Sequence, residues 1–169
     1  MTLLEVVIAS ALLLGFLLGF SHALVGTSRL SSGDREVGLA QEGARSMLEE
    51  LRTVPFTEVF RRYNSDVEDN PDTGLSPGAD FAVPGLDPQT GDADGRAGTI
   101  VFPVDDLGRV REDLEDASLG MPRDLDGDGA VDPFDHSSDY ALLPVIVRIE
   151  WRGAGGDGRF ELKTILKAW

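Results

Sequence analysis

An uncharged, mostly apolar run from Val6 to Ser28 follows directly on the five residues Met1-Thr-Leu-Leu-Glu5. A helix of about 20 apolar residues is long enough to cross a bilayer, so this run predicts a membrane-spanning helix. Glu5 lies where hydrocarbon would surround it, at a cost of roughly 2.5–3.5 kcal/mol on insertion scales. It therefore needs a cationic partner, and no lysine or arginine occurs before Arg29. The nearest positive charge is the α-amino group of Met1, from the same chain or from a neighbour.

The segment differs from a secretory signal peptide, which has a basic n-region, a shorter apolar core and a small-residue cleavage site. Its length predicts a retained anchor instead. Lysine and arginine beside a membrane span normally set its orientation, and none precedes this span. We therefore interpret Met1 as the first residue that remains after removal of a basic leader.

The 169-residue chain carries 30 acidic and 15 basic side chains, which gives a formal net charge of −15. This balance argues against nucleic-acid binding, because no basic stripe exists to neutralise phosphates. It also disfavours docking of the soluble part on anionic lipid. The chain has no cysteine, so neither disulfides nor thiol chemistry are available.

One long helix is predicted over residues 2–54. Residues 1–28 would form a hydrophobic transmembrane helix, and residues 29–169 a globular domain. In the second half of the helix, glycines leave open a break near Ser31–Gly33, and Pro55 disfavours continuation. Apolar side chains at three- and four-residue steps predict one buried face there, namely Val37, Ala40, Ala44, Met47, Leu48 and Leu51.

Beyond this helix we expect loops first and strands later. A short turn is predicted at 56–63, and residues 64–97, with four prolines and many acids, form an acidic loop region. Residues 99–104 are a candidate strand. Period-two alternation over 145–152 and 160–167 predicts a hairpin with one face on the core and the other largely polar. An amphipathic helix packed on this antiparallel sheet makes the fold class α+β.

The stretch from Asp124 to Asp135 fits the twelve-position calcium loop. Carboxylates occupy positions 1, 3 and 5, a glycine supplies the sharp turn at position 6, and a backbone carbonyl is available at position 7. Five carboxylates within twelve residues would repel one another without a cation. The predicted cofactor is therefore Ca²⁺, and the expected ligands are Asp124, Asp126, Asp128, the carbonyl of Ala130, Asp132 and Asp135.

Two features separate this loop from a helix–loop–helix sensor. Position 12 is aspartate rather than glutamate, and Gly120 and Pro122 argue against an entering helix. An unpaired site favours a stabilising role, because sensors expose a groove between paired helices. An acidic solvated loop without metal is the alternative interpretation.

The sequence shows no pattern of catalytic residues. It has no zinc-binding histidine pair, phosphate-binding Gly-Lys loop or Gly-x-Ser-x-Gly elbow. His22 lies in the apolar run, where we expect a packed or interfacial side chain. His136 follows the calcium loop, and we expect it to be exposed. The sequence therefore predicts a protein that is not an enzyme.

The opening residues resemble the mature N-terminus of the type IV pilin and type II secretion pseudopilin superfamily. The resemblance rests on Thr2-Leu-Leu-Glu5 followed by the unbroken apolar helix, and Met1–Val6 is most similar to minor pilins and minor pseudopilins. Three further stretches are similar to the same subgroup: Leu39–Gln41, Met47–Arg52 with Pro55-Phe56, and Val147–Trp151. The match is specific over roughly the first 55 residues and loose beyond them.

This resemblance implies a route of maturation and assembly. A prepilin peptidase would remove a short leader and N-methylate Met1. Glu5 would pair with the Met1 amine of a neighbouring subunit, and the helices would bundle in a filament core. The chain would begin as a single-pass protein of the inner membrane with its domain outside the cytoplasm, and then enter a pilus or a periplasmic pseudopilus.

The predicted function is therefore that of a structural subunit, a minor pilin whose partners are other pilin subunits. His22 stands where major pilins usually carry a helix-bending proline, which favours a minor subunit. The alternatives are a minor pseudopilin of a type II secretion system and a membrane-anchored calcium-binding surface protein that does not polymerise. Related pseudopilins bind calcium in different loops, so the resemblance supplies none of the ligands.

Overall fold

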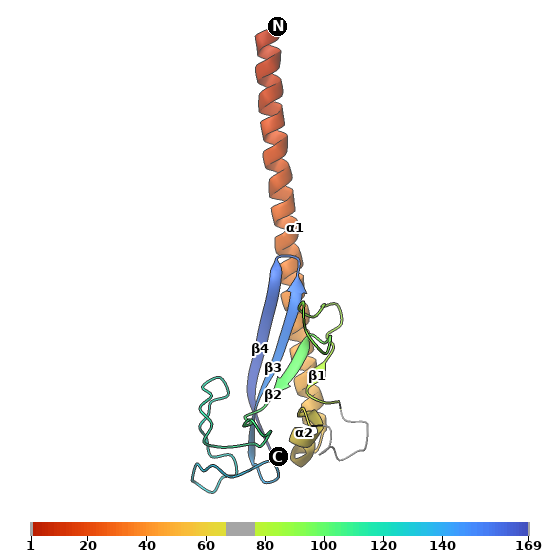
Figure 1. Ribbon diagram of the computed structural model, residues 1–169. Coiled ribbons are helices and arrows are strands. Elements are labelled where there is room, and N and C mark those ends of the chain that lie inside the picture. The colour runs from red at the N-terminus through yellow and green to blue at the C-terminus, as the bar shows by residue number, and fades with distance from the viewer. Residues whose placement is uncertain (1, 67–76, 169) are drawn as a thin grey trace.

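The computed structural model describes residues 2–66 and 77–168, which form an α+β fold (Figure 1). This confirms the predicted fold class. A long N-terminal helix projects from a small domain built on an antiparallel sheet. The elements are α1 (Leu3–Thr53), α2 (Phe56–Tyr63), β1 (Asp80–Phe81), β2 (Gly98–Val101), β3 (Leu142–Gly153) and β4 (Gly156–Lys167).

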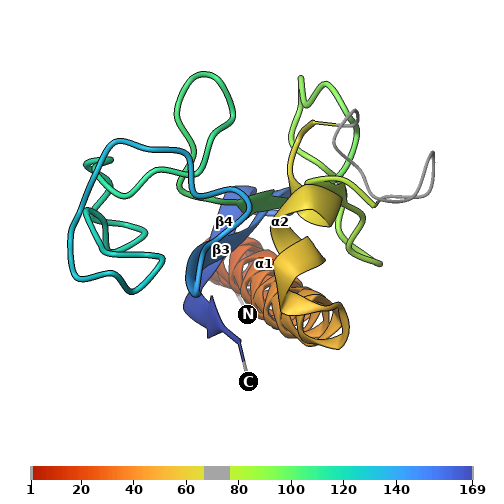
Figure 2. The ribbon, with the colours of Figure 1, turned by 90° about the horizontal axis from the view of Figure 1, so that it is seen from below.

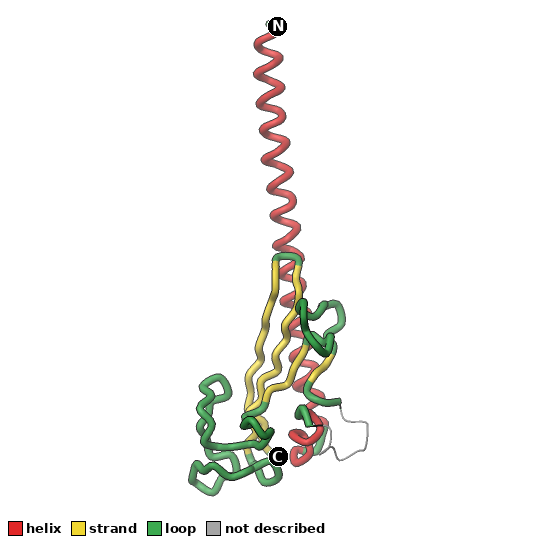
Figure 3. Tube along the Cα trace, viewed as in Figure 1, coloured by secondary structure: helices red, strands yellow, loops and turns green. Residues whose placement is uncertain are grey.

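Helix α1 runs without interruption, so the break considered near Ser31–Gly33 does not occur. The Thr2 side chain caps its first turn by accepting a hydrogen bond from the backbone N–H of Glu5. Val54 has an extended conformation, as expected for a residue that precedes proline. At 1.5 Å per residue, α1 is about 77 Å long, and roughly its first half extends beyond the domain (Figure 3).

The second half of α1 packs on the sheet through the predicted apolar stripe. Ala40, Ala44, Met47, Leu48 and Leu51 are buried, whereas Val37 is 41% exposed and was wrongly assigned to the stripe. Close approach also depends on a glycine. A Cβ at Gly43 would lie 2.8 Å from a methyl group of Val83. Glycine at this position therefore lets α1 pack closely against the segment that contains Val83.

Where α1 enters the domain, a carboxylate also joins it to the hairpin. Glu36 accepts a hydrogen bond of 3.3 Å from the Trp151 indole and one of 3.1 Å from the backbone N–H of Ala154. Hydrogen bonds to a charged group are stronger than neutral ones. These two contacts fix which face of α1 meets the hairpin turn.

The segment 56–63, predicted to be a short turn, is the helix α2 instead. Three of its side chains, Val59, Phe60 and Tyr63, are buried in the core. The Tyr140 hydroxyl accepts from the N–H of Phe60 and donates to the carbonyl of Phe56, 2.7 Å away. Tertiary packing of this kind explains why an eight-residue helix forms, since such short helices are marginal alone.

The sheet has the strand order β1-β2-β3-β4, and all neighbours are antiparallel. The predicted C-terminal hairpin is present with longer strands than expected. β3 and β4 pair over their full length, from Leu142 opposite Lys167 to Gly153 opposite Gly156. Only Ala154 and Gly155 remain for the turn. The candidate strand at 99–104 is shorter, since β2 ends at Val101.

Half of β3 departs from the expected alternation of buried and polar residues. Residues 143–147 are buried without a break, and alternation begins only at Arg148. Figure 2 shows α1 and the loop that follows β2 on different sides of β3 and β4. Apolar side chains of that loop belong to the same core cluster as β3, namely Val110, Leu119, Met121 and Leu125. Residues 143–147 of β3 are therefore covered on both faces, and the predicted polar face was wrong for them. In the paired part of β4, Lys163, Ile165 and Lys167 stay exposed.

The hairpin offers a test of close packing. A Cβ at Gly158 would lie 2.4 Å from two ring carbons of the buried Trp151, whereas a Cβ at Gly155 would meet nothing within 4 Å. Gly158→Ala should therefore lower the free energy of unfolding by about 1–3 kcal/mol. Gly155→Ala is the matched control and should change it little. Urea denaturation measures both, and equal effects would contradict this account.

On the exposed face of the hairpin, Glu161 accepts hydrogen bonds from Arg159 and Arg148. The bond from Arg159 is the main reason that the pKa of Glu161 is lowered to about 2, with the Arg148 bond adding to it against partial burial. A carboxyl whose pKa is depressed by folding stabilises the fold above its ordinary pKa, and this contribution is lost as the pH falls toward the folded value.

We therefore predict that Glu161→Gln flattens the loss of stability between about pH 5 and pH 2. The urea midpoint measured at several pH values in that window reports the effect. Glu42, exposed on α1, provides the control variant Glu42→Gln, which should keep the wild-type slope. A wild-type slope in Glu161→Gln would rule out this ion-pair cluster as a source of acid sensitivity.

Candidate functional site

The loop between β2 and β3, residues 102–141, contains the predicted calcium loop. A short stretch, residues 110–112, lies beside both ends of the calcium loop. The N–H of His136 bonds to the carbonyl of Val110, and the N–H of Arg123 bonds to the carbonyl of Glu112. The carbonyl of Leu125 accepts from Ala141 and Leu142, which ties the loop to the start of β3.

Three of the predicted ligands lie together. Oxygens of Asp124, Asp126 and Asp128 fall within 4.8 Å of one another, a spacing that a cation could bridge. Gly127, between Asp126 and Asp128, and Gly129, directly after Asp128, adopt positive φ, 85° and 92°, a conformation that favours glycine. Both oxygens of Asp124 accept backbone N–H groups of these two glycines, at 2.6 and 2.9 Å.

The remaining predicted ligands stand apart from this group. Asp132 accepts from the N–H of Phe134 at 2.8 Å, and Asp135 accepts from the N–H and the hydroxyl of Ser137. Ala130 is exposed at the loop surface, and its N–H bonds to Asp128. Among the described residues, only Asp124, Asp126 and Asp128 of the expected set cluster within 4.8 Å. Calcium binding through all six would require Asp132 and Asp135 to turn toward that cluster.

His136 is buried, with 4% of its surface exposed, so its predicted exposure was wrong. Its two ring nitrogens face different carboxylates, Asp139 at 3.1 Å from Nδ1 and Asp132 at 3.2 Å from Nε2. Glu112 and Asp126 lie farther away, at 3.9 and 3.7 Å. An imidazolium ring can donate to carboxylates on both sides at once.

The charge environment acts on the pKa of His136 in two directions. Burial favours the neutral ring and is the largest single influence, but the hydrogen bond to Asp132, the nearby charge of Glu112 and the contact with Asp139 together outweigh it. The pKa of His136 is therefore raised above its ordinary value. His136, Glu112 and Asp126 also lie close enough to be considered as metal ligands. The ring hydrogen-bonds instead to Asp139 and Asp132, whereas Glu112 and Asp126 lie beyond hydrogen-bond distance of it.

At the other end of the molecule, the helical segment Leu3–Leu24 is both long enough and apolar enough to cross a membrane. Its large apolar side chains are exposed throughout, from 85% at Leu3 to 49% at Val6. Glu5 is exposed in the first turn, and within the described residues its carboxylate has no partner. Met1, whose amine is the predicted partner and whose methylation is predicted, lies outside the described residues.

Glu5 also has a purely local role. Thr2 and Glu5 stand three apart at the helix start, as in a capping box, and a carboxylate in the first turn interacts favourably with the helix dipole. These effects are worth about 1 kcal/mol or less at an exposed site. They fall short of the roughly 2.5–3.5 kcal/mol that a carboxylate costs inside a membrane, so capping alone does not account for Glu5 in an anchored chain.

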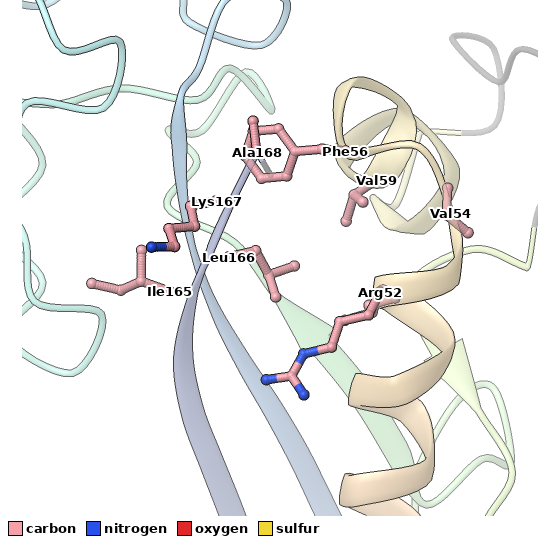
Figure 4. A pocket seen from close by; sticks show the side chains of 9 residues that line it. Arg52, Val54, Phe56, Val59, Ile165, Leu166, Lys167 and Ala168 are labelled. Carbon is pink, nitrogen blue, oxygen red and sulfur yellow. The ribbon is translucent and has the colours of Figure 1, made fainter.

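A pocket of about 320 Å³ lies between the end of α1, the start of α2 and the end of β4. Figure 4 shows Phe56, Val59 and Leu166 lining it together with Arg52 and Lys167. Apolar side chains dominate the lining, and Arg52 and Lys167 add two cationic groups.

The predicted calcium loop, residues 124–135, is called the aspartate loop below. Two buried residues beside it, Glu112 and His136, were not identified from the sequence. A signal for Glu112 exists in the chain. Val110 and Glu112 are two apart and are both buried, whereas Arg111 between them is partly exposed. This is the period of an extended segment with one covered face, and a glutamate in phase with a buried valine indicates a carboxylate with internal partners.

Comparison with protein-family models, with curated proteins and with solved structures yields no match. The resemblance of the first residues to pilins therefore stays a prediction from their sequence. What the fold adds is the arrangement of those residues on an exposed, uninterrupted helix.

Proposed function

We propose that this protein is a structural subunit of a type IV pilus-like filament, a minor pilin, which assembles through α1. Glu5 would pair with the N-terminal amine of Met1 in a neighbouring subunit. The partners of the protein would be other pilin subunits. A prepilin peptidase would act on the chain before assembly, and the inner membrane would hold the unassembled chain.

The observation that supports this proposal most is the exposed apolar surface of Leu3–Leu24 on the same helix that packs against the sheet. An apolar surface of this extent needs a cover of lipid or of other apolar helices. Glycines at 15 and 19, four residues apart, would allow neighbouring helices to approach closely. A helix that can exchange lipid for other helices suits a subunit that leaves the membrane to join a filament.

We further propose that the aspartate loop binds Ca²⁺ and stabilises the domain. The cluster of Asp124, Asp126 and Asp128 supplies hard oxygen ligands, which calcium prefers. Since the loop covers one face of β3, metal held there would stabilise the core beneath it.

Two alternatives share parts of this account. A minor pseudopilin of a type II secretion system would use the same helix and the same pairing at Glu5. A membrane-anchored calcium-binding protein would use the helix only as an anchor. Neither alternative assigns a chemical reaction to the chain.

Mass spectrometry of purified surface filaments tests the proposal. We expect this chain to co-purify with other pilin subunits and to begin with an N-methylated Met1, a mass increase of one methyl group. Recovery with components of a secretion machine would favour the pseudopilin. Recovery only in the membrane fraction with an unmethylated N-terminus would contradict a role in any such filament.

A further inference from the structure

Glu112 is a buried carboxylate outside the aspartate loop whose side-chain hydrogen bonds, as described, all come from that loop. The His136 ring lies 3.9 Å from it. The Glu112 side chain is 1% exposed. It accepts three backbone hydrogen bonds, from Leu125 at 2.5 Å, Asp126 at 3.2 Å and Asp132 at 3.1 Å. A buried charge is costly unless it is paired or well hydrogen-bonded, and these three bonds provide that compensation.

The two oxygens of Glu112 divide between the two limbs of the loop. Oε1 accepts from Leu125 and Asp126 at the beginning of the loop, and Oε2 accepts from Asp132 in its second half. The planar carboxylate of Glu112 therefore sets the distance between the beginning of the loop and its second half. Because both oxygens already accept N–H groups, Glu112 is placed as a support for the loop rather than as a ligand.

The loop has no flanking helices that could do this work. The described segments 113–123 and 136–141 contain turns and bends but no helix. In a helix–loop–helix site the flanking helices hold the ends of the loop together. Here the backbone bond from Arg123 to the Glu112 carbonyl and the side-chain bonds of Glu112 join the loop to a neighbouring segment.

We propose that Glu112 is a positioning residue that shapes the aspartate loop before any metal binds, and that it thereby sets the calcium affinity of the loop. The second part rests on the calcium binding proposed above. Glutamine cannot replace this carboxylate, because its amide has one acceptor oxygen and its NH₂ group only donates. At least one loop N–H would lose its partner and stay buried.

The test uses the full chain in detergent micelles and the variant Glu112→Gln. Without metal, in chelator, we expect the amides of Leu125, Asp126 and Asp132 to exchange hydrogen at least tenfold faster in the variant. Calcium titration by calorimetry should give a dissociation constant raised about 10- to 100-fold, as found for groups that support metal ligands. Exchange at β3 amides, such as Val147, reports whether the core is intact.

Glu115→Gln is the matched control, since Glu115 is exposed three residues away and loses the same charge. It should leave both measurements at wild-type values. Wild-type exchange at the three loop amides in Glu112→Gln would overturn the proposal. Faster exchange in a protein whose wild type binds no calcium would support the shaping of the loop and refute the calcium site.

Should Glu112→Gln not fold, the wild-type chain still decides. In chelator, the amides of Leu125, Asp126 and Asp132 should exchange at least tenfold more slowly than that of Val131, which has no acceptor among the described contacts. Equal rates at all four amides would overturn the role assigned to Glu112.

Discussion

Glu5→Ala should lower incorporation of this chain into filaments about 100-fold while leaving its insertion in the membrane intact. In the unassembled subunit, Glu5 costs roughly 2.5–3.5 kcal/mol within hydrocarbon. Pairing with a neighbouring amine would recover that cost in the filament. Alanine removes the cost and the recovery together, and each 1.4 kcal/mol changes an equilibrium tenfold. Immunoblots of sheared filament and membrane fractions measure the change.

Two further variants separate charge pairing from helix capping. Glu5→Gln keeps a side chain that a capping box accepts but removes the charge, so it should fail as Glu5→Ala does. Thr2→Ala removes the hydroxyl that caps the first turn and keeps the carboxylate, so it should still assemble. Efficient assembly of Glu5→Gln would refute the pairing, and failure of Thr2→Ala alone would assign the effect to the cap.

Removal of calcium should lower the melting temperature of the globular domain by about 10 °C. A ligand that binds only the folded state at 100 times its dissociation constant stabilises it by about 2.7 kcal/mol. For a domain of this size, 1 kcal/mol corresponds to roughly 3–5 °C. Calorimetry of the full chain in detergent, with calcium and then with excess chelator, measures this shift.

Asp128→Asn tests whether the aspartate loop is the origin of the shift. It removes one charge from the cluster of Asp124, Asp126 and Asp128 and should abolish most of the calcium response. Asp106→Asn makes the same change of charge at an exposed position outside the loop, and its response should equal that of the wild type. Identical melting curves with and without calcium in the wild type would leave the loop as a solvated acidic segment.

The long helix could be predicted because its signal is strong and local. Apolar residues fill Leu3–Leu24, and a stripe at three- and four-residue spacing follows, so both halves satisfy the same helical period. Its end was fixed by Pro55. Helix α2 was missed although Phe56, Val59, Phe60 and Tyr63 follow the helical period. Eight residues rarely form a stable helix alone, and the contacts with Tyr140 that hold this one come from far away in sequence.

The sheet shows the same limit. Alternation over 145–152 predicted a strand with one polar face, but residues 143–147 are buried on both faces because the loop after β2 covers the second one. The sequence of β3 alone does not indicate that this second face is buried. The covering loop has no helix or strand of its own between Pro103 and Ala141, so its position is set by contacts between distant residues.

The aspartate loop was found from a motif, which records ligands and omits their supports. Asp124, Asp126 and Asp128 lie together as the pattern predicts, because Gly127 and Gly129 allow the required turns. Glu112 and His136 lie outside the twelve positions, and their roles depend on burial. Burial of a charged residue is a property of the whole fold, which a twelve-residue pattern does not contain.

The continuity of α1 determines how the domain is rotated about the helix axis relative to the N-terminal half of the helix. With no break between Leu3 and Thr53, and with Glu36 holding the hairpin to one side of the helix, the bearing of the domain is fixed by residue count. One residue inserted between 26 and 32 would swing the domain about 100° around the helix axis. Seven inserted residues would return it to within about 20° and move it outward by roughly 10 Å. Wherever these helices pack side by side, the number of residues in α1 thus determines which face of each domain lies toward its neighbour.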